Sequence, residues 1–384
     1  MNPILLLTLG GFVQGTELFV IAGILPRIAQ DLGVGISVAG QLVTLFALVY
    51  AVGAPLLAAA TGSVPRRRLL TLAMLAFAMA NLMAALAPSY GTLLVSRAVA
   101  ALSGCLFLPT ALALAARLAA PGRRGQALAA VMAGLNVSTL LGVPAGILIA
   151  NAWGWRWTFG VLALFALLVS IGVRILLPEV EPPPATPLRE RLLVLSKPGT
   201  QRALLLTVAV LLPVYAIYTY LTQVLGSGYR GSDLARLLAI FGVSSVVGTW
   251  LGGMLVDRIG SRSLLIAAVA VLSLSLTGFS LPRLPFAGAA AFLSLWGLFG
   301  GAFNPAQQHR LLELSPGGSG AVLAWNSSAV YLGQALAGAL GGLLLHAFGA
   351  AHLGWMFGAF LALSGTVLLM PASHQGNGIL TENA

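Results

Sequence analysis

The most unusual residue of the sequence is Glu17, which lies in the apolar stretch QGTELFVIAG (residues 14–23). It is the only residue between Pro3 and Pro26 that carries a charge at pH 7. Burying a carboxylate away from water is unfavourable, so its presence requires a functional or a structural reason. A carboxyl group in such surroundings can alternate between its protonated and ionised forms, which is the chemistry of proton transfer.

Arg97 is a possible basic partner, because it lies in a second apolar stretch, LLVSRAVAALSG (93–104). A buried acid and a buried base reduce each other's cost of burial where they meet. Protonation of Glu17 would then release Arg97 and let a proton compete with another ligand. Two alternatives remain open: Glu17 is a protonated group that hydrogen-bonds neighbouring helices, or Arg97 braces its own helix through backbone carbonyls.

Aromatic and amide side chains in other apolar stretches suit a small solute, because rings stack on flat molecules and amides give directional hydrogen bonds. Gln14 lies three residues before Glu17, on the same face of a helix. Asn136 and Asn326 begin the related stretches NVS and NSS. A role of these two amides in helix packing is favoured over a role in solute binding. The other candidates are Tyr215 and Tyr218, with Thr222 on the same face, and Trp296, Phe303 and Gln307 in a second stripe.

The chain that carries these residues is too apolar for a soluble protein. Of its 384 residues, 59% are hydrophobic and 8% are charged, whereas a soluble domain is about 25% charged. Such a chain cannot cover its own surface with polar groups, so its solvent is lipid. The single cysteine, Cys105, and the lack of Cys/His spacings predict no disulfide and no metal site. No cofactor is expected.

Twelve apolar segments are long enough to cross a bilayer as helices. They cover residues 3–25, 37–60, 69–87, 91–117, 127–150, 155–177, 203–224, 233–256, 263–281, 285–309, 320–346 and 353–371. A polar, proline-rich stretch separates the sixth segment from the seventh and reads as a linker, with a short helix expected at 187–195. The predicted domains are a six-helix bundle at 1–177, a cytoplasmic linker at 178–200, a second six-helix bundle at 201–371 and a cytoplasmic tail at 372–384.

Arginine clusters predict how the helices are oriented. They occur in SVPRRRLL (63–70), RLAAPGRRG (117–125) and VDRIGSR (256–262). These loops and the linker all face the cytoplasm if both termini do. The net charge of +11 therefore reflects membrane orientation, and no nucleic-acid partner is expected. The predicted location is the bacterial inner membrane.

The two halves of the sequence repeat. PGRRGQALA (121–129) matches PGGSGAVLA (316–324) at an offset of 195 residues. The stretch that ends at Leu70 matches the stretch that ends at Leu265 at the same offset. A third match, of Gly154-Trp155 in NAWGWRWTF with Gly354-Trp355 in GAAHLGWMF, has an offset of 200. Repeated six-helix halves are typical of transporters that rock about a central site.

Several motifs resemble those of the major facilitator superfamily. GMLVDRIGSRSLL (253–265) is similar to the family's loop motif G-x-L-A-D-R-x-G-R-R-x-x-L, although in the first-half copy Gly62 replaces the aspartate. The Arg97 stretch resembles the fourth-helix arginine motif, and GLNVSTLLGVPAG (134–146) loosely resembles the fifth-helix antiporter motif. GTELFVIAGILPRIAQDLGV and GWRWTF are similar to the drug–proton antiporter branch with twelve spans, especially its sugar- and arabinose-efflux-like members.

The resemblance implies an all-α fold of two pseudo-symmetric bundles and export of a small sugar-like or drug-like solute in exchange for protons. Glu17 would carry the proton and Arg97 would modulate it. Their depths below the outer helix ends, ~12 and ~10 Å, make a pair plausible. Gating is assigned to Asp257, Arg258 and Arg262, which would help to hold the inward face closed. The protein would act as a monomer in contact with lipid.

Other functions remain as alternatives. An uncoupled facilitator or an importer of a sugar, nucleoside or amino acid would keep the fold without the proton. A membrane enzyme would need paired acids, a Ser/His pair or metal ligands, and the sequence shows none. A sensor would be favoured by a substantial soluble domain, which the sequence also lacks.

Overall fold

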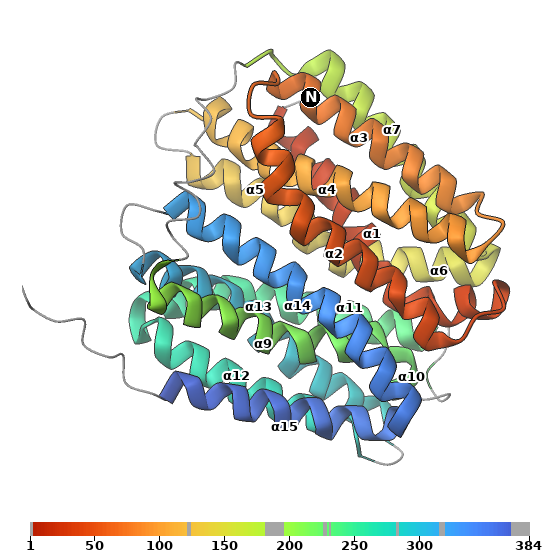
Figure 1. Ribbon diagram of the computed structural model, residues 1–384, viewed down its shortest axis with the longest axis vertical. Coiled ribbons are helices and arrows are strands. Elements are labelled where there is room, and N and C mark those ends of the chain that lie inside the picture. The colour runs from red at the N-terminus through yellow and green to blue at the C-terminus, as the bar shows by residue number, and fades with distance from the viewer. Residues whose placement is uncertain are drawn as a thin grey trace, which may run out of the picture.

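The computed structural model describes residues 3–120, 124–180, 196–225, 229, 232–281, 284–314 and 319–369. Across these residues the chain forms helices and no strand. Figure 1 shows two groups of long helices, the first half of the chain (red to yellow-green) above the second half (green to blue). Helices satisfy all their backbone polar groups internally, which lipid requires of spanning segments.

The first half contains six spans. They are α1 (Pro3–Asp31), α2 (Ile36–Ala60), α3 (Arg66–Ala85), α4 (Tyr90–Leu118), a composite fifth span of α5 (Arg124–Val137), η1 (Ser138–Gly142) and α6 (Val143–Trp153), and α7 (Trp155–Leu176). The π-helical turn η1 lies inside the stretch that resembles the antiporter motif, and the sequence analysis did not predict it. Such turns occur mostly as single insertions in α-helices, often at functional sites.

The second half repeats the arrangement. Its elements are α9 (Pro198–Thr219), α10 (Leu221–Leu225), α11 (Ser232–Ile259), α12 (Ser261–Gly278), α13 (Phe286–Leu314), α14 (Ser319–Phe348) and α15 (Ala350–Leu369). The seventh span was predicted as one helix over 203–224, and that prediction was wrong, because the helix is interrupted at Tyr220. Thr222 therefore lies on α10 and does not share the face of α9 that carries Tyr218.

Equivalent helices begin at nearly one offset, which confirms the internal repeat. Helices α1 and α9 start at Pro3 and Pro198, and α3 and α12 start at Arg66 and Ser261, a difference of 195 residues in both pairs. The packing repeats as well: α1 contacts the fifth span as α9 contacts α14, and α3 contacts α7 as α12 contacts α15. The structure is therefore two pseudo-symmetric bundles.

The sequence match at an offset of 200 was misleading. The turn before the sixth helix and the turn before the twelfth helix are equivalent at an offset of 195. The sixth helix follows Gly154 and the twelfth follows Gly349, with φ angles of +97° and +80°. Glycine adopts this left-handed region without the steric cost that a Cβ atom brings. The repeated tryptophans of the two sequence stretches therefore occupy different positions relative to the turn.

The chain is a multi-pass membrane protein. Among the described residues, 11 helices are long and apolar enough to cross a membrane. The twelfth predicted segment is also helical, as the 20-residue α15. Large apolar side chains are exposed on the outer faces, including Trp250 at 66% and Leu363 at 71%. Lipid, unlike water, solvates such a surface favourably.

The halves make their most extensive contacts along two helix pairs. Helix α2 packs against α14 across the boundary, as Figure 1 shows, and α11 packs against η1 and α6. Small residues permit the close approach: a Cβ atom on Gly242 of α11 would lie 2.6 Å from the backbone oxygen of Thr139. Close backbone packing at small residues is typical of membrane helices.

The start of the linker contacts α3. Arg67 forms an ion pair with Glu179 and also donates a hydrogen bond of 3.3 Å to the carbonyl of Leu177. The short helix predicted at 187–195 and the tail at 372–384 lie outside the described residues. The predicted domain boundaries therefore stay predictions.

Candidate functional site

Glu17 and Arg97 meet inside the first bundle. Glu17 is on α1 and Arg97 on α4, and their side chains form an ion pair in which each is 1% exposed. The matching depths estimated from the sequence correctly placed the two groups at one level. Their roles in proton transfer stay predictions. Two charges removed from water are stable only as a pair, so loss of either would strand the other.

The pair keeps unused hydrogen-bonding capacity. Among the described residues, Oε2 of Glu17 and Nε of Arg97 are buried without a hydrogen-bond partner, and so is Nε2 of the neighbouring Gln14. The guanidinium carbon of Arg97 lies 4.5 Å from the ring centroid of Phe46, a cation–π contact. Buried polar atoms normally find partners, so these atoms are available to water, a proton or a polar solute.

A small cavity adjoins this site. It is bordered by Gln14, Phe46, Tyr50 and Tyr331, among others, and its volume is about 10 Å³. That volume is about enough for one water molecule. The site is therefore nearly closed in this conformation, and a larger solute needs the halves to move.

The sequence analysis missed Tyr50 and Tyr331. Their rings stack across the two halves, with centroids 3.6 Å apart and planes at 20°. They come from α2 and α14, and the sequence analysis named no candidate residue in the segment that forms α2. The available signal was a lone tyrosine within each of these apolar segments, VYAVG and VYLGQ.

Two of the four predicted aromatic residues of the second half contact each other. Tyr218 and Trp296 are buried, and their rings make an edge contact at 6.2 Å. Tyr218 also contacts the ring of Phe19 and donates a 3.3 Å hydrogen bond to its carbonyl. Phe303 is 1% exposed, and Tyr215 is partly buried against the core. The contacts of Tyr218 join α9 to α13 and to α1 of the first half.

Gln307 and Asn326 belong to a separate polar network. The hydroxyl of Thr207 donates to Oδ1 of Asn326 at 2.9 Å, and Nε2 of Gln307 donates to that hydroxyl at 2.9 Å. Gln307 also donates to the carbonyl of Ala203 at 2.6 Å. The network connects α9, α13 and α14, and all three polar side chains are buried. This geometry holds helices together, while Oε1 of Gln307 keeps no partner among the described residues.

The structure does not bring the remaining candidates to Glu17. Asn136 is partly buried on α5, and its carbonyl accepts a hydrogen bond from Thr139. Asp257, Arg258 and Arg262 are exposed at the junction of α11 and α12. Substrate binding by Asn136 and gating by the other three stay predictions.

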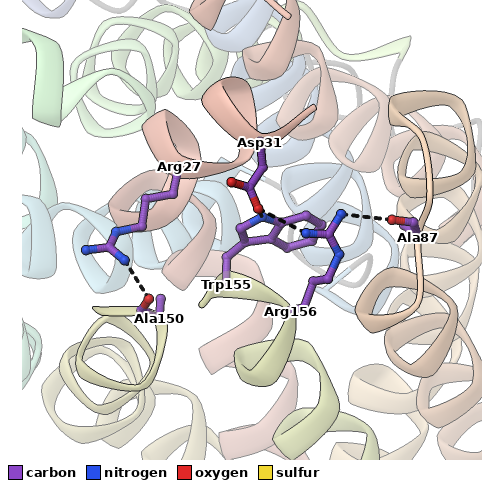
Figure 2. A network of polar contacts seen from close by, with 6 residues as sticks. All are labelled: Arg27, Asp31, Ala87, Ala150, Trp155 and Arg156. Atoms are coloured by element: carbon purple, nitrogen blue, oxygen red, sulfur yellow. Dashed lines mark hydrogen bonds and ion pairs between the residues drawn. The ribbon is translucent and has the colours of Figure 1, made fainter. Parts of the chain in front are cut away.

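A second and larger cavity lies at the opposite end of α1 from the N-terminus. Its volume is about 550 Å³, and its lining includes Arg27 and Asp31 of α1 and Trp155 of α7. Figure 2 shows the polar contacts there: Asp31 accepts from Nε1 of Trp155 at 2.9 Å and from Arg156 at 3.0 Å. Arg156 also donates to the carbonyl of Ala87 at 3.1 Å, which ties the sixth helix to the turn after α3.

This geometry can be compared with known families. The model of the Major Facilitator Superfamily matches residues 7–317 and again residues 237–382. The chain belongs to the major facilitator superfamily. It is accordingly a transporter and not an enzyme.

Relatives within the superfamily include proteins named for chloramphenicol resistance and for sugar efflux. The MFS-type transporter YbcL of Bacillus subtilis is 33% identical over 370 residues, which cover 95% of each chain. A chloramphenicol resistance protein of Streptomyces lividans is 37% identical over 276 residues, 70% of each chain. A probable sugar efflux transporter of Mannheimia succiniciproducens is 28% identical over 367 residues, covering 94% of this chain and 91% of the relative. The chain is therefore similar to sugar-efflux-like members of the superfamily.

A solved structure shares the fold. The D-xylose–proton symporter aligns with a TM-score of 0.78 at 18% identity, covering 95% of this chain and 96% of the symporter. At that identity the likeness concerns the fold alone. It agrees with the two-bundle architecture of this facilitator-superfamily member.

Proposed function

We propose that this transporter exports a small sugar-like or drug-like solute in exchange for protons, with Glu17 as the proton carrier and Arg97 as its modulator. The observation that carries the proposal is the buried ion pair, which keeps an unpartnered oxygen on Glu17 and an unpartnered nitrogen on Arg97 beside a small cavity. Acidic residues in the membrane are rare and costly, about 2.5–3.5 kcal/mol on insertion scales, and commonly mark proton paths.

Coupling follows from competition for the pair. Protonation of Glu17 removes its charge and leaves Arg97 without an anion, so Arg97 turns to the Phe46 ring or to carbonyls. The unpartnered oxygen of ionised Glu17 accepts a hydrogen bond from the solute, so solute binding is favoured when Glu17 has lost its proton. Protonation of Glu17 weakens this acceptor and releases the solute, so proton and solute exchange at the pair.

Two features support a sugar-like or drug-like solute. Gln14 offers a buried amide with an unpartnered nitrogen, and the stacked Tyr50 and Tyr331 present flat rings at the same cavity. A sugar or an aromatic drug uses both kinds of contact. The relative named for sugar efflux supports export, and the relative named for chloramphenicol resistance supports a drug-like solute.

The same proposal includes location and assembly. The arginine clusters favour the bacterial inner membrane with both termini in the cytoplasm. We propose a monomer that contacts lipid on all sides and needs only protons and solute as partners. Asp257, Arg258 and Arg262 would then stand at the cytoplasmic junction of α11 and α12, where they can stabilise closure of the inward face.

The alternative function is an uncoupled facilitator or an importer. It is favoured by the near-complete burial of the ion pair, since a permanently ionised pair can serve as a brace between α1 and α4. In that case transport would proceed without proton movement.

Flux in proteoliposomes separates these functions. Purified protein is reconstituted with a pH-sensitive dye inside, and a panel of sugars, nucleosides and cationic dyes is added to wild type, Glu17→Gln and the control Glu313→Gln. Glu313 is an exposed acid near one end of α13, 53% accessible. The proposal expects solute-driven proton movement in wild type and control and its loss in Glu17→Gln. Equal, proton-independent exchange in all three would contradict it.

A further inference from the structure

The 550 Å³ cavity at the far end of α1 has walls from both halves of the protein. Arg27, Gln30 and Asp31 of α1 line one side, with Asn151 of α6. The other side includes Thr222, Gln223, Tyr229 and Leu234 of the second half. The volume lies within the usual range of small-molecule sites, about 300–1,000 Å³.

The cavity carries an excess of positive charge. Its acid, Asp31, already accepts hydrogen bonds from Trp155 and from the guanidinium of Arg156, whose charge balances it (Figure 2). Arg27 has no acidic partner among the described residues, and one of its nitrogens donates to the carbonyl of Ala150 at 2.7 Å. The rest of this guanidinium is exposed at the cavity and suits a carboxylate, which it can bind by two parallel hydrogen bonds.

Neutral polar groups surround this cation. Nδ2 of Asn151 and Oγ1 of Thr222 are buried and lack a hydrogen-bond partner among the described residues, and both residues line the cavity. The amides of Gln30 and Gln223 are further donors and acceptors at the wall, and the hydroxyl of Tyr229, which donates to the carbonyl of Leu284, is a further acceptor. A ligand with several hydroxyl groups would satisfy them, because a buried polar atom without a partner is unfavourable.

This cavity is separate from the Glu17 site. Arg27 follows Glu17 by ten residues along α1, which is about 15 Å of helix. Phe19 lies between them, and Tyr218 covers it through a ring contact and a hydrogen bond to its carbonyl. None of the residues that border the small central cavity lines the large one.

We propose that this cavity is a second solute-binding site, specific for a small polyhydroxy carboxylate such as a sugar acid, with Arg27 as the residue that binds the carboxylate. Because its walls belong to both halves, a ligand bound there stabilises the arrangement in which α1 and α6 stand close to α10 and α11. This consequence rests on the alternating access of the proposed function, whereas binding itself does not.

Equilibrium binding to purified protein in detergent tests the site without any transport. Three probes are used. Glucuronate carries both hydroxyl groups and a carboxylate, glucose carries hydroxyl groups alone, and propionate carries a carboxylate alone. Wild type is compared with Arg27→Gln, Thr222→Val and Glu17→Gln. Arg174→Gln is the matched control, because Arg174 is an exposed arginine in the last turn of α7, far along the chain from the cavity.

We expect saturable binding of glucuronate to wild type, to Arg174→Gln and to Glu17→Gln. The Kd for glucuronate should rise about tenfold or more in Arg27→Gln, because the ligand then loses one charged hydrogen-bonding partner. Thr222→Val should raise the Kd by a smaller factor. This variant tests the site even if Arg27→Gln does not fold. Glucose and propionate should each bind more weakly than glucuronate.

Three results would overturn the site. They are the absence of saturable glucuronate binding to wild type, an unchanged Kd in both cavity variants, and loss of binding in Glu17→Gln, which would move the ligand to the central site. Failure of proton coupling in proteoliposomes would leave these binding results unaffected, so the two proposals fail separately.

Discussion

The two bundles share their backbone arrangement but differ in what occupies equivalent positions. In the first half Glu17 and Arg97 form a buried ion pair between α1 and α4. At the repeat offset of 195, the second half has Leu212 and Phe292 on α9 and α13, which are both apolar. The second half instead joins these helices through the Tyr218–Trp296 contact and the Thr207 network.

The difference shows that packing alone does not require charge at this place. One copy of the fold closes with apolar and neutral polar side chains, while the other keeps two ions at a cost in free energy. A buried ion pair that is energetically unfavourable and occurs at only one of two equivalent positions is expected where a function requires it. We infer that the first half carries the proton and the second half mainly contributes shape and neutral contacts.

The largest effect is expected from breaking the pair on one side. Arg97→Phe leaves an uncompensated carboxylate in the bundle and should lower the free energy of unfolding by about 3–5 kcal/mol. The double variant Glu17→Leu/Arg97→Phe copies the residues of the second half, so most of that loss should be restored. Thermal unfolding in detergent measures both.

If the double variant were as unstable as the single one, the ions would be needed for packing. The comparison between the halves would then lose its meaning. The same variants can be assayed for flux, where both should lack proton coupling.

A medium effect is expected where the same residue type is packed differently in the two halves. Gly53 and Gly248 are equivalent at the offset of 195. A Cβ atom on Gly248 would lie 1.9 Å from the backbone oxygen of Leu298, whereas on Gly53 it would meet a side-chain atom of Leu102 at 3.2 Å. Gly248→Ala should therefore cost about 1–3 kcal/mol, and Gly53→Ala clearly less, because a side chain can move aside.

Chemical denaturation or thermal unfolding of the two alanine variants compares them directly. Equal losses would show that α2 is packed in the first half as rigidly as α11 is in the second.

The smallest effect is expected in the neutral network of the second half. Thr207→Val removes the hydroxyl that joins Gln307 to Asn326. Hydrogen bonds between membrane helices contribute about 0.6 kcal/mol on average, so the loss of stability should be on the order of 1 kcal/mol. Proton-coupled flux should persist, and its disappearance would mean that the second half takes part in coupling.

The sequence was sufficient for the fold because the signals were redundant. Apolar runs predicted the helices, and the arginine-rich loops predicted how the helices are oriented in the membrane. The 195-residue repeat predicted two similar bundles, which the first residues of equivalent helices confirm. The depths of Glu17 and Arg97 could be estimated from helix rise alone, and the structure shows them in contact. Periodicity failed at Tyr220, where the helix breaks without a proline or glycine at that position.

Contacts between distant segments could not be predicted in this way. The stacking of Tyr50 on Tyr331 depends on how α2 lies against α14, and no local pattern encodes that register. The grouping of Asp31, Trp155 and Arg156 likewise needs the turn after α6 to meet the end of α1. Such contacts depend on the angle and register at which distant helices meet.

Proton release on solute binding tests the central claim most directly. A solute identified in the flux panel is added to purified protein in a weakly buffered detergent solution with a pH dye, and wild type is compared with Glu17→Gln. If proton and solute compete at the Glu17–Arg97 pair, wild type releases protons as solute binds, and Glu17→Gln binds the solute without any release. Equal proton release by the two proteins, or none by wild type, would contradict the assignment of Glu17 as the proton carrier.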